Sequence, residues 1–120
     1  MLKILVADKY NIHRIGFVQI LAESFPDAII GEANDTDSLF TKITAENWDL
    51  IISGFIAPVD KGIEIIRKIK TDSPDAPVAI CGLEVQEGNV TRLLDAGACE
   101  YIDKGAKAAS IARQVKKILK

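Results

Sequence analysis

The sequence has few of the residues that staple or mark specialised small folds. Its 120 residues include two cysteines, one histidine and one tryptophan. Cys81 and Cys99 have no CxxC spacing, which argues against a disulfide-rich scaffold and a cysteine-based zinc site. Both lie in apolar surroundings, so we expect two buried, reduced side chains, with a redox role as the alternative.

The charged residues show no excess of one sign. Fifteen Lys and Arg residues face seventeen Asp and Glu residues, which gives a formal net charge of −2. Bulk charge therefore gives no reason to expect nonspecific binding to nucleic acid or to a membrane surface. The first apolar run ends at Asp8, too early for a signal peptide or a membrane span. We expect a cytoplasmic protein without a membrane partner.

The apolar content of 48% is sufficient for one compact domain over residues 1–120. Short apolar runs, rich in β-branched or small residues, alternate with longer amphipathic segments. These short runs predict five strands, at residues 3–7, 28–33, 50–53, 78–81 and 99–102.

The segments between the runs carry apolar residues at helical spacing, which predicts five helices. The apolar positions are Ile12, Ile15, Val18, Leu21 and Ala22; Leu39, Phe40 and Ile43; Ile63, Ile66 and Ile69; the segment 90–96; and Ile111, Ala112, Val115, Ile118 and Leu119. The last helix has Arg113, Lys116, Lys117 and Lys120 on its opposite face. Asp35 or Thr36 is expected to cap the second helix, and Gly97 to end the fourth.

Five strand-then-helix units predict parallel strands with right-handed crossovers, because continuous apolar strands must be covered on both faces. The fold class is a doubly wound α/β sandwich of three layers. In such sheets ligands bind beyond the carboxyl ends of the strands. The residues expected there are Asp8, Lys9, Ser53, Gly54, Gly82 and Lys104.

Four sequence blocks have the spacing of a known family. They are residues 4–8, which end in an acidic residue; residues 49–53; Pro58 with Gly62; and residues 97–104, which hold a Gly-Ala pair, Tyr101 and Lys104. Over essentially its whole length the chain resembles a response-regulator receiver domain, and it is most similar to receivers that precede a helix-turn-helix DNA-binding domain. The resemblance implies a flavodoxin-like (βα)5 fold with strand order 2-1-3-4-5.

Family members accept a phosphoryl group from a histidine kinase on an Asp at the end of the third strand. Three carboxylates, a divalent metal, a Lys and a Thr or Ser take part. Counting back four residues from Pro58 places Gly54, which has no nucleophile, at the acceptor position. By the same resemblance, Lys9 replaces the second acidic residue and Gly82 replaces the hydroxyl residue, so only Asp8 and Lys104 remain. Tyr101 matches the aromatic residue that moves during switching.

The charges of this degenerate pocket disfavour a metal. Three carboxylates and one Lys sum to about −2 in the family, which suits Mg²⁺. Asp8, Lys9 and Lys104 sum to about +1, so we expect neither a metal nor a cofactor. Asp8 and Lys104 are expected to form a residual ion pair, with an anion site as the alternative. His13, the only histidine, is expected to be a surface or capping residue.

The leading hypothesis is a pseudo-receiver, a regulatory module without phosphorylation control and without enzymatic activity. It would act on a protein partner or a second copy through the fourth helix, the fifth strand and the fifth helix, and on DNA only through a further C-terminal domain. With Gly82 leaving room inward, Tyr101 is expected to stay in a single locked state. The alternative is a sensor that binds a small anionic molecule in the pocket of Asp8, Lys9 and Lys104.

Overall fold

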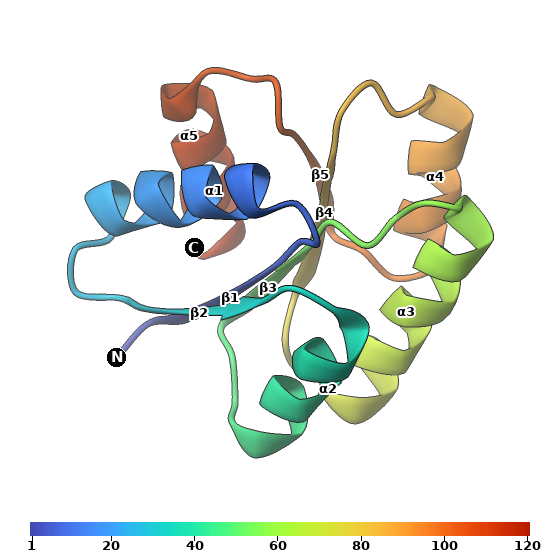
Figure 1. Ribbon diagram of the computed structural model, residues 1–120, viewed down its shortest axis with the longest axis horizontal. Coiled ribbons are helices and arrows are strands. Elements are labelled where there is room, and N and C mark those ends of the chain that lie inside the picture. The colour runs from blue at the N-terminus through green and yellow to red at the C-terminus, as the bar shows by residue number, and fades with distance from the viewer.

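The computed structural model describes all residues 1–120 and contains five strands and five helices in strict alternation (Figure 1). In chain order they are β1 Lys3–Ala7, α1 Asn11–Ser24, β2 Ile29–Ala33, α2 Thr36–Ala45, β3 Leu50–Ser53, α3 Val59–Asp72, β4 Val78–Gly82, α4 Glu87–Asp95, β5 Glu100–Asp103 and α5 Ala108–Ile118. The predicted strands agree with these bounds to within one residue at either end.

The five strands form one parallel sheet in the order β2-β1-β3-β4-β5. Figure 1 shows α1 and α5 on one face and α2, α3 and α4 on the other. The predicted three-layer α/β fold is confirmed. Every residue of β3 and β4 is buried, as expected for central strands covered by helices on both faces.

Alternate residues of β1 supply the two sides of the core. Ile4 and Val6 belong to the apolar cluster under α1 and α5, whereas Leu5 and Ala7 belong to the cluster under α2 and α3. This period of two follows from the pleat of a strand. The sheet is therefore held firmly from both faces, and its carboxyl ends are fixed in space.

Two helix ends follow the predicted signals. Asp35 caps α2 by accepting a hydrogen bond of 2.7 Å from the Ser38 backbone N–H, and Ser38 caps Asp35 in return. The backbone N–H of Ser38, together with its side chain, lowers the pKa of Asp35. Gly97, just after α4, has a φ of 129°, which favours glycine.

One prediction about burial, that of Cys99, is wrong, and α1 buries only some of its apolar positions. In α1 the buried residues are Phe17 and Leu21, whereas Ile12 and Ile15 are 84% and 56% exposed. This helix carries apolar residues on more than one side, so their spacing alone does not select the inward face. Cys81 is buried but Cys99 is exposed, because Cys99 precedes β5 rather than lying within it.

None of the five helices is long and apolar enough to cross a membrane.

Candidate functional site

A cavity of about 530 Å³ lies at the carboxyl ends of β1, β3, β4 and β5. Of the residues predicted to lie there, Lys9, Gly54, Gly82 and Lys104 line it. Asp8 directly precedes Lys9 in the sequence, but it is buried and does not line the cavity. The strand order thus brings together residues that are up to 95 positions apart, from Lys9 to Lys104.

Asp8 and Lys104 form a buried ion pair. Asp8 Oδ2 lies 2.5 Å from Lys104 Nζ, and the two side chains are only 1% and 7% exposed. Oδ2 accepts no hydrogen bond, so the ion pair is its polar contact, whereas Oδ1 accepts a hydrogen bond of 3.0 Å from the Tyr10 backbone N–H. Each charge is therefore compensated mainly by the other, which a buried pair requires.

His13 joins this pair, although we expected it to be a surface or capping residue. Its Nδ1 lies 3.2 Å from Lys104 Nζ. An ammonium group can only donate, so Nδ1 accepts this hydrogen bond. The contact links the first turn of α1 to the end of β5, and no local sequence signal reports it.

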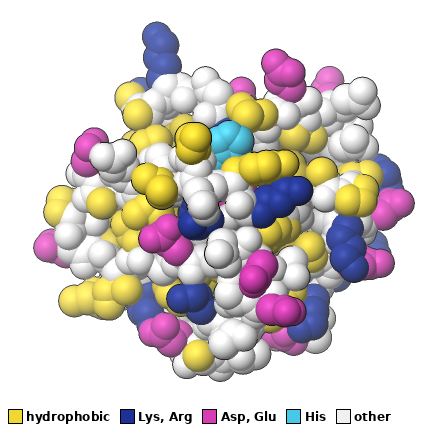
Figure 2. Space-filling view, viewed as in Figure 1, with side chains coloured by type: hydrophobic (Ala, Val, Ile, Leu, Met, Phe, Trp, Pro, Cys, Tyr) yellow, Lys and Arg dark blue, Asp and Glu magenta, His cyan; other side chains and the backbone are white.

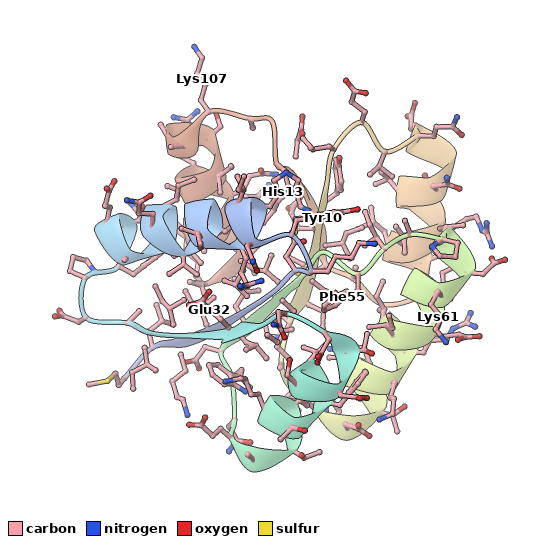
Figure 3. The ribbon with its side chains drawn as sticks, in the orientation of Figure 1. Tyr10, His13, Glu32, Phe55, Lys61 and Lys107 are labelled. Atoms are coloured by element: carbon pink, nitrogen blue, oxygen red, sulfur yellow. The ribbon has the colours of Figure 1, made fainter.

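Tyr10 is the second residue that the sequence did not reveal. The ammonium groups of Lys9 and Lys104 lie 5.0 Å and 5.6 Å from the centre of its ring. Both distances fall within the range of cation–π attraction. Figure 3 shows Tyr10 beside His13 at the start of α1, close to Phe55 in the loop after β3.

Gly54 follows the last residue of β3 and donates a backbone hydrogen bond of 2.7 Å to the Ala7 carbonyl. A Cβ added at Gly54 would lie 2.7 Å from Asp8 Oδ2. The Asp8 carboxylate thus lies against the bare Cα of Gly54. A side chain at position 54 would require this carboxylate to move.

Gly82, the last residue of β4, is covered by apolar side chains. A Cβ at this position would lie 2.6 Å from both Ile56 Cδ1 and Val85 Cγ2. The Tyr101 hydroxyl donates a hydrogen bond of 3.2 Å to the Gly82 carbonyl, so it points back toward the end of β4. Burial raises the pKa of Tyr101, with a smaller contribution from the charge of Asp103.

Cys81 lines the same part of the cavity. Burial raises the pKa of its thiol to about 12, and the nearby Lys104 offsets only part of this rise. A thiol with this pKa remains protonated near neutral pH and is a poor nucleophile. The site therefore offers no activated cysteine.

Comparison with known proteins identifies the family. The family described as the response regulator receiver domain matches residues 4–116. The chain belongs to the response regulator receiver family. Receiver domains are regulatory parts of two-component signalling systems.

Two relatives and one solved structure illustrate the match. The chain is 28% identical over 116 residues to "Response regulator GacA" of Pseudomonas syringae pv. syringae, covering 97% of this chain and 54% of the relative. The same figures hold for "Transcriptional activator protein ExaE" of Pseudomonas putida. The chain thus spans about half the length of the curated relatives it matches.

A LuxR family DNA-binding response regulator from Silicibacter pomeroyi has the same fold. Its crystal structure superposes with a TM-score of 0.83 at 22% identity, covering 99% of this chain and 91% of the other. At this level of identity the likeness concerns the fold alone.

Proposed function

We propose that this chain is a receiver-type regulatory module that is not switched by phosphorylation at the usual site. The observation that carries the proposal is Gly54 at the end of β3, four residues before Pro58. Phosphoryl transfer needs a nucleophilic oxygen at this point of the sheet, and glycine provides none.

The surroundings of Gly54 support the same proposal. The space beside its Cα is taken by the Asp8 carboxylate, whose charge is balanced by Lys104. Gly82, where the family has a hydroxyl residue, lies under Ile56 and Val85. An incoming phosphoryl group would meet neither a free acceptor nor a hydroxyl donor.

A divalent cation does not fit these residues. Mg²⁺ prefers carboxylate oxygens, and Asp8 is the one carboxylate at the site. Its Oδ2 already contacts the Lys104 ammonium, and Lys9 stands where the family has its second acidic residue. Two cations beside one carboxylate would repel the metal.

The output of the module is proposed from its relatives. ExaE is described as a transcriptional activator and is about twice as long as the matched segment. We infer that this module controls an attached or partner DNA-binding output through α4, β5 and α5. Tyr101, held against the Gly82 carbonyl, would keep that surface in one state.

The test is incubation with Mg²⁺ and acetyl phosphate, followed by intact-mass measurement. We expect no phosphate adduct on the natural chain, because position 54 has no acceptor. A stoichiometric adduct, stable or labile to acid, would refute the proposal.

A matched series of variants supplies the positive control. Gly54→Asp alone should not restore labelling, because Lys9 still repels the metal and the new side chain meets Asp8. With Lys9→Asp added, the two substitutions together change the pocket sum from about +1 to about −2, and this double variant should give weak labelling. Adding Gly82→Thr should strengthen it. Robust labelling of the single variant would show that the charge of Lys9 matters less than proposed.

A further inference from the structure

The cavity has the size and the composition of a small-molecule site. Its volume of about 530 Å³ lies within the range of ligand pockets, roughly 300–1,000 Å³. Fifteen residues line it and eight of them are hydrophobic. The lining contains Lys9, Lys61, Lys104 and His13 but no Asp or Glu. Even when the buried Asp8 is counted against Lys104, the cavity keeps a positive balance.

Most of the basic residues and the apolar residues of the cavity come from different parts of the fold. Lys9 and Lys104 follow β1 and β5, and His13 lies in the first turn of α1. Lys61, in α3, is the exception, and it forms an ion pair with Glu64. The apolar residues come from the loops that lead to α3 and α4; they are Phe55, Ile56, Leu83 and Val85. A ligand that fills the cavity would meet positive charge at one end and apolar surface at the other.

The apolar part of the cavity reaches the surface. Tyr10 and Leu83 are 53% and 50% exposed, and both line the cavity. On the face shown in Figure 2, hydrophobic and basic side chains surround the single histidine. Exposed apolar residues that gather at a concave site mark a binding surface more often than scattered ones do.

Lys104 retains capacity for a further partner. An ammonium group has three N–H donors. One is directed to His13 Nδ1, and the ammonium also forms an ion pair with Asp8 Oδ2, so at least one N–H remains for an anion in the cavity. Lys9 makes no ion pair, and its ammonium lies over the exposed Tyr10 ring. An aromatic plane with an exposed cation beside it suits a flat ring that carries a negative group.

We propose that the cavity binds an amphipathic small molecule, a planar aromatic ring that carries an anionic group. The anion would lie near Lys9 and Lys104, and the ring would lie against Tyr10 and the apolar residues. Such a ligand would provide an input to the module proposed above, in place of a phosphoryl group. The inference rests on that proposed function only for its regulatory meaning, because binding itself needs no assumption about phosphorylation.

The test uses three probes that separate charge from ring. Naphthalene-2-sulfonate has both, 2-naphthylmethylamine has the ring with the opposite charge, and inorganic phosphate has the charge without the ring. With isothermal calorimetry and amide chemical-shift mapping on the whole chain, we expect the sulfonate to bind with a Kd on the order of 1 mM or tighter. The amine and the phosphate should bind at least about tenfold more weakly.

Matched variants locate the site. Lys9→Gln should weaken sulfonate binding by about 3- to 10-fold, the loss expected for one partly exposed cation beside an aromatic ring. Tyr10→Ala should weaken it by a similar factor. Lys68→Gln is the control, because Lys68 also lies over an aromatic ring, 3.9 Å from the centre of Phe40, but lines no part of this cavity. It should leave binding unchanged.

Three results would overturn the inference: no sulfonate binding, equal binding of the amine, or equal losses in the Lys9 and Lys68 variants. Treating the same sample with acetyl phosphate keeps the two proposals distinct. If the chain does not bind the sulfonate and also forms no phosphoryl adduct with acetyl phosphate, only the proposed ligand site is overturned. A phosphate adduct on a chain that binds the sulfonate would overturn only the proposed function.

Discussion

The carboxyl edge of the sheet has two unlike parts. After β1 and the edge strand β5 it holds the charged residues Asp8 and Lys104, whereas β3 and β4, which lie between these two strands, lead to Gly54 and Gly82, which have no side chains. In the order β1-β3-β4-β5 the charged residues are three strand spacings apart, about 14 Å between backbones. Their side chains nevertheless meet at 2.5 Å. The ion pair therefore reaches across the ends of β3 and β4, the inner part of this edge.

This contrast supports the proposal that the pocket is not switched by phosphorylation although the receiver fold is kept. The ion pair is satisfied within itself, since Asp8 and Lys104 balance each other. In the inner part, Ile56 and Val85 cover Gly82 and line the cavity. The proposed module would thus have one buried ion pair and apolar surroundings where its family has several charges.

The largest effect should come from breaking the ion pair. Lys104→Met leaves the Asp8 carboxylate buried without a counter-charge, and we expect a loss of about 3–5 kcal/mol in the free energy of unfolding. Urea denaturation followed by circular dichroism measures it. This cost means that Lys104 variants test stability before they test any ligand.

The double variant Asp8→Asn with Lys104→Met is the matched control. It removes both charges and retains a side-chain oxygen for the Tyr10 N–H, so it should recover most of the lost stability. If the double variant lost as much stability as Asp8→Asn and Lys104→Met together, the two charges would not be coupled. Asp8 and Lys104 would then not compensate each other's charge.

The next largest effect concerns the boundary between the two parts. Gly54→Ala places a Cβ 2.7 Å from Asp8 Oδ2, so the carboxylate must shift within a tightly packed site. We expect a destabilisation of about 1–3 kcal/mol, typical of overpacking. Thermal unfolding of the two proteins measures the difference.

Gly16→Ala is the control for this substitution. Gly16 lies within α1, and a Cβ there meets nothing within 4 Å. Because alanine is the better helix former, the free energy of unfolding of this variant should rise by about 0.5–1 kcal/mol. If both variants changed stability in the same direction, the proposed crowding between Gly54 and Asp8 would be wrong.

The positions of these residues could be predicted from the sequence, but their contacts could not. Apolar runs and helical spacing located every strand and helix, and the rule for parallel sheets placed Asp8, Gly54 and Lys104 at one edge. His13 and Tyr10 were missed as members of the site. Their partner Lys104 is more than 90 positions away, and its reach depends on packing rather than on local pattern.

The same limit applies to burial within a helix. In α1 the helical spacing predicted the helix but did not select its inward face: Ile12 and Ile15 are exposed, whereas Phe17 is buried. Periodicity predicts a face only when the other face is polar. The α5 helix meets this condition, and its Ile111 and Val115 are buried as predicted.

The smallest effect leaves stability unchanged and tests how closed the inner part of the edge is. Burial raises the pKa of Cys81 to about 12, so at pH 8 only about one molecule in ten thousand carries the thiolate there. Cys99 is exposed, although partial burial of its thiol also raises its pKa.

With an aromatic disulfide reagent such as DTNB under native conditions, we expect the Cys99 thiol to react more slowly than free cysteine and the Cys81 thiol to react only on unfolding. A Cys99→Ser variant should lose the first reaction alone, and raising the pH from 8 to 9 should speed that reaction while Cys81 stays protonated. If Cys81 reacted in the folded Cys99→Ser protein as readily as Cys99 does in the natural chain, its thiol would not be buried beneath the cavity as the structure describes it.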